Sequence, residues 1–135
     1  MHTNNFVETV RLDAETKVRL STLKKRTGIA NWNILCRWAF CLSLADESPV
    51  RDREERDVGA VEMTWRTFAG DDEVVYRFLL IERCQKDNGK TDRELLSSTL
   101  RQHISRGAAR LAAAGGVKSA TELVELTYRS RRKVA

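Results

Sequence analysis

The stretch Arg26–Leu44, RTGIANWNILCRWAFCLSL, decides the fold of this 135-residue chain. Between residues 32 and 45 only Asn33, Arg37 and Ser43 are not apolar, and the run contains neither glycine nor proline. Such a run predicts a helix that is apolar on every face and therefore has to be buried on all sides. Because a chain of this length has little interior, we expect the helix to be shared between the subunits of an obligate oligomer.

A strand and another helix precede this apolar helix. Residues 6–12 alternate weakly between apolar and polar side chains, which predicts a short strand. Asp13 can cap a helix that runs to about residue 27, where Gly28 supplies the stop. Asn31 is the natural cap of the apolar helix, which we expect to end near residue 46.

The second half of the chain predicts one more strand and three more helices. Residues 47–60 are a solvated linker of mixed charge, and the alternation over 61–67 indicates a half-buried strand. A helix over about 73–86 should follow. The apolar side chains expected on its buried side are Val75, Phe78, Leu79 and Ile81.

Two capping boxes predict the last two helices. Thr91 with Glu94 begins a long helix that reaches about residue 114, and Ser119 with Glu122 begins a helix that continues through about residue 129. The expected fold is therefore one mainly α domain. Its parts are a ribbon-helix-helix-like strand-helix-helix core over 9–46, the linker over 47–60, a strand plus three helices over 61–129, and a basic tail over 130–135.

Composition limits the classes of function. The formal net charge of +5 favours polyanionic partners without selecting one. The first ten residues lack the apolar core of a signal peptide, and no apolar run approaches the roughly 20 residues of a membrane span, so we expect a cytoplasmic protein without a membrane partner. The odd set Cys36, Cys41 and Cys84 lies in apolar helical patterns, which indicates reduced core thiols.

The helix over 14–27 is the best candidate for contact with phosphates. On a helical wheel Lys17, Lys24 and Lys25 fall on one side, and Arg19 and Arg26 extend the positive surface. An ordinary solvated face is the alternative. The backbone amides of residues 29–32, at a helix start after a glycine turn, are of the type that binds anions.

Two arginines lie outside that helix. Arg11 lies on the polar side of the predicted strand, where ribbon-type DNA readers place a base-contacting side chain; a merely solvent-exposed arginine is an equal alternative. Arg37 interrupts the apolar helix and needs a carboxylate, helix-end carbonyls or a phosphate, because burying an unpaired guanidinium is costly. We favour an ion pair at a subunit interface over a DNA contact.

No catalytic or metal-binding pattern stands out. Cys36 and Cys41 are about 140° apart around a helix, so they do not converge on one ligand. His103 has no partner at a recognisable spacing, and the sequence shows no nucleophile–base pair, phosphate loop or metal motif. We therefore expect no catalytic residue, no metal and no cofactor.

The segment Thr27–Leu44 resembles the signature of the DNA sulfur-modification protein DndE family. Thr27-Gly28 and the run from Asn33 to Leu44 match a TG-x-x-x-x-NILCR-x-A-x-CLSL-like core that follows a basic helix. The sequence His103-Ile104-Ser105-Arg106-Gly107 is similar to the family's His-x-x-Arg-Gly element. One departure is Asn31-Trp32, where the family commonly has Thr-Pro; asparagine caps as well as threonine, so the helix boundary should survive.

The resemblance implies a function. The family serves in phosphorothioation, in which sulfur replaces an oxygen of a backbone phosphate. The resemblance also implies a ribbon-helix-helix-like fold and a homo-oligomer, which is a tetramer in the family. It further implies binding to double-stranded DNA, especially at nicks, and action together with larger sulfur-transfer and ATPase subunits.

We therefore expect an oligomeric, non-catalytic DNA-binding subunit of a sulfur-modification complex, which contacts backbone phosphates. One alternative is a ribbon-helix-helix transcriptional repressor, which would prefer one operator over random duplex by at least ~10³. The other is a metal-dependent nicking endonuclease that uses acids such as Asp71, Asp72 or Glu73.

Overall fold

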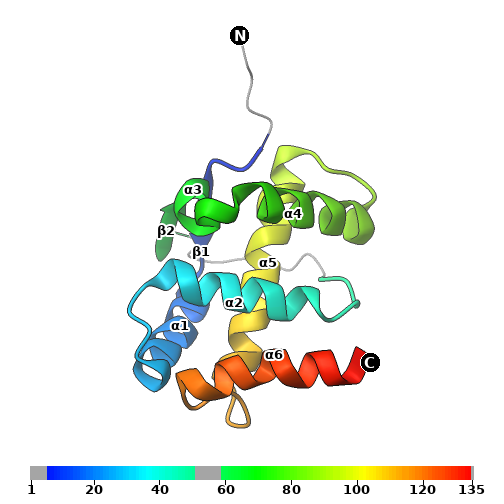
Figure 1. Ribbon diagram of the computed structural model, residues 1–135. Coiled ribbons are helices and arrows are strands. Elements are labelled where there is room, and N and C mark those ends of the chain that lie inside the picture. Colours follow the sequence, from blue (N-terminus) through cyan, green and yellow to red (C-terminus); the bar gives the residue numbers. More distant parts are fainter. Residues whose placement is uncertain (1–5, 51–58, 135) are drawn as a thin grey trace.

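The computed structural model describes residues 6–50 and 59–134, with side chains described as far as Thr127 (Figure 1). The sequence prediction of a mainly α chain with two short strands is confirmed. Most of the predicted charged linker, residues 51–58, lies outside the described residues. In chain order the elements are β1 (Thr9–Leu12), α1 (Ala14–Thr27), α2 (Trp32–Leu44), β2 (Val61–Thr64), α3 (Trp65–Ala69), the 3-10 turn η1 (Gly70–Asp72), α4 (Glu73–Asn88), α5 (Arg93–Ala112) and α6 (Ala120–Val134).

The core lies between α2 and α5, which cross at Gly107 (Figure 1). A Cβ atom on Gly107 would come within 1.7 Å of the carbonyl oxygen of Ala39, so only glycine allows the two backbones to approach this closely. The inner face of α2 is buried against α5 and contributes Leu35, Cys36 and Phe40 to the core.

Within the single chain α2 is buried on one side, and the expected cover of its other side by a second subunit stays a prediction. Cys41 is exposed, and Trp38 and Leu42 are only half-buried. The 20-residue helix α5 passes behind α2 and supplies an interior for one face of it. The chain thus covers one face of α2 and leaves the side that carries Trp38, Cys41 and Leu42 partly open.

The two strands pair with each other inside the chain. β1 runs antiparallel to β2 with Arg11 opposite Glu62, while Val10 and Leu12 point into the core. The predicted strand over 61–67 is too long, because Thr64 accepts a hydrogen bond from the Thr67 backbone N–H and thereby caps α3. In a ribbon-helix-helix dimer the ribbon is formed with the partner's strand, whereas here one chain supplies both strands.

Most helix ends lie where the sequence predicts them. Asp13 Oδ1 accepts from the Thr16 N–H at 2.8 Å, and Gly28 ends α1 with φ of 75°. Asn31 occupies the cap position of α2, but its side chain makes no capping bond. Asp92, rather than the expected Thr91, caps α5.

Half of the predicted capping box of α6 is formed, since Ser119 Oγ accepts from the Glu122 N–H. The Glu122 carboxylate accepts from the Lys118 N–H rather than from that of Ser119. The helix itself continues to Val134, which is further than the sequence predicts. Among the described residues, no helix is long and apolar enough to cross a membrane.

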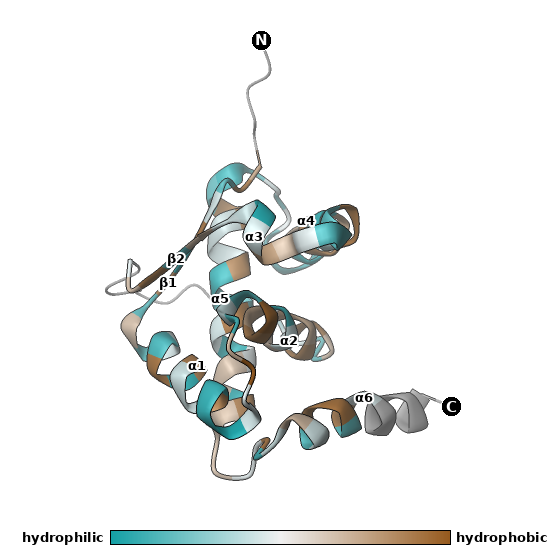
Figure 2. Ribbon diagram, turned by 60° about the vertical axis from the view of Figure 1, so that its left-hand side comes forward, coloured by the Kyte–Doolittle hydropathy of each residue, from teal (hydrophilic) through white to brown (hydrophobic). Residues whose placement is uncertain are grey.

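The buried face of α4 is predicted incorrectly. The core takes Leu80, Arg83 and Cys84 from this helix, whereas Val75 and Phe78 point to solvent. The sequence is apolar around most of the helix circumference, so periodicity cannot select the inner face; packing against α5 does. Figure 2 shows the resulting apolar turns of α4 at the outside of the molecule.

Candidate nucleic-acid interface

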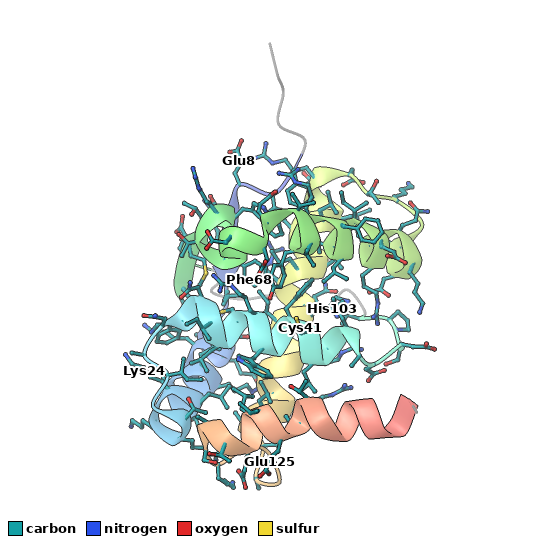
Figure 3. All side chains as sticks on the ribbon, viewed as in Figure 1. Glu8, Lys24, Cys41, Phe68, His103 and Glu125 are labelled. Carbon is teal, nitrogen blue, oxygen red and sulfur yellow. The ribbon has the colours of Figure 1, made fainter. Side chains whose placement is uncertain are left out.

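The lysines of α1 form an exposed cationic face. Lys17, Lys24 and Lys25 are all exposed, and none of them makes an ion pair with a described residue. Lys24 projects outward from the left-hand edge of the molecule (Figure 3). The opposite face of α1 is held in the core by Leu20 and Leu23, which are fully buried. Packing therefore fixes the rotation of α1 that presents these lysines to solvent.

The three arginines predicted to contact DNA, Arg19 and Arg26 on α1 and Arg11 on β1, are engaged within the chain. Arg19 Nη2 lies 2.6 Å from Glu15 Oε1, and Arg11 Nε lies 3.6 Å from Glu62 Oε1. Arg26 Nη1 donates to the carbonyl oxygen of Ala112 at 3.0 Å and so binds the C-terminal end of α5. The described structure thus brings Lys17, Lys24 and Lys25 together as cations without internal partners.

A hollow of about 430 Å³ lies at the start of α2. Lys17 lines it together with residues 30–33 and residues of β2. The side chain of Asn31 makes no capping bond, and the Ile34 N–H bonds to the Asn31 carbonyl oxygen, so the N–H groups of Trp32 and Asn33 are those available to an anion. The Ile29 N–H, also expected in the anion site, bonds to Thr27 Oγ1 at 3.2 Å. Glu62 also lines the hollow, where its carboxylate is paired with Arg11.

Arg37 finds its partners inside the chain. Its Nε donates to the Phe68 carbonyl oxygen and its Nη2 to that of Thr67 at 3.2 Å, both near the end of α3. Within the chain its ligands are therefore helix-end carbonyls, one of the three kinds of partner expected for it, while an ion pair at a subunit interface stays a prediction. The guanidinium lies against Gly70, where a Cβ would come within 2.6 Å of Nη2.

A buried polar cluster joins α2, α4 and α5. His103 Nε2 lies 2.9 Å from Asp87 Oδ2, and His103 Nδ1 lies 2.7 Å from Ser43 Oγ. Arg106 Nε donates to the same Ser43 oxygen at 2.8 Å. This network assigns the proton of a neutral His103 to Nε2, with Ser43 donating to Nδ1. Burial lowers the pKa of His103 to about 4.

Serine, histidine and aspartate in this order resemble a hydrolytic triad, but the site is closed. Ser43 and His103 are fully buried, and neither of them lines the hollow at the start of α2. Without access for a substrate, the cluster is a structural contact between helices.

Two arginines extend this contact to the end of α2. Arg83 donates to the carbonyl oxygens of Leu44 at 3.0 Å, Asp46 at 2.6 Å and Ser48 at 2.8 Å. Arg106 donates to the carbonyl oxygens of Ser43 at 2.9 Å and Ser48 at 2.8 Å. These bonds satisfy carbonyls that a helix terminus otherwise leaves without partners.

The cysteines and acids do not assemble a reactive centre. Cys36 and Cys84 are buried as predicted, and burial raises the pKa of the Cys36 thiol to about 12. Cys41 is exposed, contrary to prediction, because α2 is not covered on that side. No group of three or more His, Cys, Asp or Glu side chains within residues 6–50 and 59–127 is placed to hold a metal ion. Glu73 is engaged by Trp65 Nε1 at 3.0 Å and Arg77 Nε at 2.7 Å.

The comparison with protein families decides the identity. The family model described as "DNA sulphur modification protein DndE" matches residues 9–119, from β1 to the residue before α6. The chain belongs to this family. No curated protein sequence matches it.

Two crystal structures of DndE proteins share the fold. One is the structure of DndE from Escherichia coli B7A, described as involved in DNA phosphorothioation modification. It superposes on this chain with a TM-score of 0.63 and 23% sequence identity. The match covers 77% of this chain and 96% of that chain. The structure of a DndE G21/24K mutant, involved in DNA phosphorothioation, has a TM-score of 0.59 and 20% identity and covers 76% and 93%.

Membership of the DndE family places the chain in DNA phosphorothioation, as the resemblance of the signature segment implies. The structure also explains why the two signature segments occur together. Ser43 of the first bonds to His103 and Arg106 of the second, and Ala39 of the first packs on Gly107 of the second. The DndE signature is therefore largely the α2–α5 contact.

Proposed function

We propose that this DndE-family protein is a non-catalytic DNA-binding subunit of a phosphorothioation complex. It binds the phosphates of the DNA backbone through α1. The observation that carries the proposal is the set Lys17, Lys24 and Lys25, exposed on one helix face and free of internal ion pairs among the described residues. Free ammonium groups bind phosphate without first breaking a salt bridge. The released counterions then add to the affinity.

The hollow at the start of α2 supports the same ligand. Lys17 and the uncapped amides of the first turn of α2 face one space, and a phosphate oxygen satisfies both kinds of donor. Lys24 and Lys25 lie two turns along α1 from Lys17, about 11 Å away by helix geometry. Each DNA strand carries one phosphate per about 3.4 Å of helix axis, so α1 can span more than one phosphate.

Backbone contact is favoured over the sequence-specific repressor. A ribbon reader needs free side chains on its strands, but Arg11 is paired with Glu62 across the strand pair. The strands also pair within one chain, so no two-chain ribbon is available to enter the major groove.

A non-catalytic role is favoured over the nicking endonuclease. Glu73 is held by Trp65 and Arg77, which leaves Asp71 and Asp72 alone at the start of α4. Two neighbouring carboxylates without a further ligand are a weak site for a catalytic metal.

The family resemblance supplies the remaining parts of the proposal. We infer a cytoplasmic homo-oligomer, with a tetramer as the expected form, that prefers nicked to intact double-stranded DNA and works with sulfur-transfer and ATPase subunits. The chain itself needs no cofactor in this role.

Binding to labelled nicked, intact and single-stranded DNA tests the proposal. The variant Lys24→Ala/Lys25→Ala should weaken binding to both duplexes about equally. The control Lys90→Ala/Arg93→Ala removes the same charge from exposed residues at the α4–α5 connection, far from α1, and should bind as the unmodified protein does (Figure 1). Equal losses in the two variants would indicate a response to net charge alone, and binding to none of the DNAs would refute the proposed function.

A further inference from the structure

We propose that the hollow at the start of α2 holds an unstacked base of the bound DNA, with Trp32 as its stacking partner. The inference deepens the proposed function and rests on it, since a base reaches the hollow only when the DNA is bound. In this arrangement the α1 lysines bind phosphates, whereas the hollow binds the base attached to one of them.

The lining of the hollow suits a planar, mostly apolar ligand. Its volume is about 430 Å³, within the range of small-molecule sites. The apolar part of the lining comes from the segments around the starts of α2 and β2, and consists of Ala30, Trp32, Ala60, Val61 and Met63. A phosphate gains nothing from such a surface, because apolar side chains leave water only against an apolar partner. The hollow therefore has more apolar surface than a phosphate site needs.

Trp32 is the residue that selects a base. Its side chain is half-buried, since it packs against the core and also lines the hollow. Exposed aromatic rings stack on nucleobases with little regard to sequence, because every base has a π face. Trp32 also stands where the family signature commonly has proline. The stacking surface is therefore a property of this chain rather than of the signature.

The polar side chains at the hollow match the rest of a nucleotide. Lys17 makes no ion pair with a described residue, so its ammonium group is free to bind the phosphate attached to the base. The exposed Asn31 side chain makes no hydrogen bond to a described residue, and its amide can both donate to and accept from the edge of a base. Glu62 is already paired across the strands, and Asn33 Nδ2 donates to the Thr67 carbonyl oxygen at 3.2 Å.

A base of an intact duplex has to leave its stack before it enters the hollow. Unstacking costs least for a base that is mismatched or already unpaired. The hollow should therefore take an unpaired base in preference to a paired one. The α1 lysines make no such distinction, because every duplex carries phosphates at the same density. In this account general affinity comes from α1, and the preference for interrupted DNA comes from the hollow.

An abasic substitution in the DNA tests the base site. One DNA is a nicked duplex with a single unpaired nucleotide at the nick, and the other has an abasic sugar at that position, so both carry the same phosphates. The unmodified protein should bind the first more tightly by roughly 5- to 150-fold, the contribution of one base stacked on an aromatic side chain. Trp32→Leu should bind the two DNAs equally, whereas Trp32→Phe should keep most of the difference. The slope of log K against log salt should be the same in all three proteins, because no lysine is changed.

Ala30→Leu tests the hollow with the tryptophan in place. Ala30 is exposed, so the fold should survive, as a melting curve will show, while the larger side chain fills part of the hollow and reduces the difference between the two DNAs. Ala120→Leu, the same change at the exposed first residue of α6, should leave the difference as it is.

Equal binding of the two DNAs by the unmodified protein would overturn the base site. An unchanged difference in a folded Trp32→Leu variant would overturn it too, and Ala30→Leu decides in the same way if Trp32→Leu does not fold. These results leave phosphate binding through α1 in place. The proposed function fails separately, when the protein binds none of the DNAs.

Discussion

His103 of α5 and Asp87 of α4 are joined by a hydrogen bond of 2.9 Å, and both side chains are almost fully buried. Asp87 also accepts from Arg83 Nε at 2.9 Å, so the carboxylate binds the arginine and the neutral imidazole together. The pair links the α4–α5 packing to the end of α2, which Arg83 holds by its other nitrogens.

The protein should lose stability in mild acid because of His103. Burial lowers its pKa in the folded protein to about 4, below the unfolded value of 6.5, so the folded state disfavours the proton. Stability is full above pH 6.5 and falls as the pH decreases through the window from 6.5 to 4. The loss should reach about 3 kcal/mol between pH 7.5 and pH 4.

Urea unfolding at a series of pH values measures this loss. His103→Gln should be less stable at pH 7.5 but should show a flatter pH dependence between 6.5 and 4. Asp46, whose pKa is lowered mainly by its hydrogen bonds with Ser48, titrates below this window, so it does not mask the effect. Equal stability of the unmodified protein at pH 7.5 and pH 4.5 would show that His103 is not buried in its neutral form.

Gly107→Ala should destabilise the protein strongly. The added methyl would lie 1.7 Å from the Ala39 carbonyl oxygen, and neither backbone can move without separating α2 from α5. We expect a cost of about 3 kcal/mol or more, the upper end for overpacked sites. Gly115→Ala is the control, because nothing lies within 4 Å of its added Cβ. A melting temperature that falls equally in both variants would contradict the close crossing.

Arg83→Met should also destabilise the protein. The change leaves the Leu44 carbonyl oxygen without its arginine donor and Asp87 without its cation. The carbonyl oxygens of Asp46 and Ser48 lose one of two arginine donors, since Arg106 also donates to both. Removing one partner of such a buried pair costs about 3 to 5 kcal/mol. Arg93→Met, which breaks only the exposed pair with Glu8, should cost less than about 1 kcal/mol in the same urea titration. Similar costs for the two changes would show that the α2 end is not held by Arg83.

Local signals in the sequence predicted the helix ends well. Asp13 and Gly28 define α1 through bonds to neighbouring residues, so their positions alone suffice. The inner face of α4 was not predictable in the same way. Its apolar residues surround the helix, and only the packing partner α5, which follows later in the chain, selects Leu80 over Phe78.

The roles of the arginines were the hardest to predict. The side chains of Arg26, Arg37 and Arg83 bind carbonyl oxygens that are 86, 31 and 39 positions away in the sequence. No periodicity or spacing indicates such contacts. The free lysines of α1 were predictable, because a helical wheel is sufficient to place them on one exposed face.

The salt dependence of DNA affinity tests the central claim most directly. The variant Lys17→Ala/Lys24→Ala/Lys25→Ala and the unmodified protein are titrated with the same nicked duplex over a range of salt concentrations. Each phosphate contact contributes about 0.9 to the slope of log K against log salt on duplex DNA, so the slope should flatten by up to about 3 for each subunit engaged. The circular dichroism spectrum should not change, because Leu20 and Leu23 still hold α1 in place. An unchanged slope in the folded variant would show that α1 is not the DNA-binding surface.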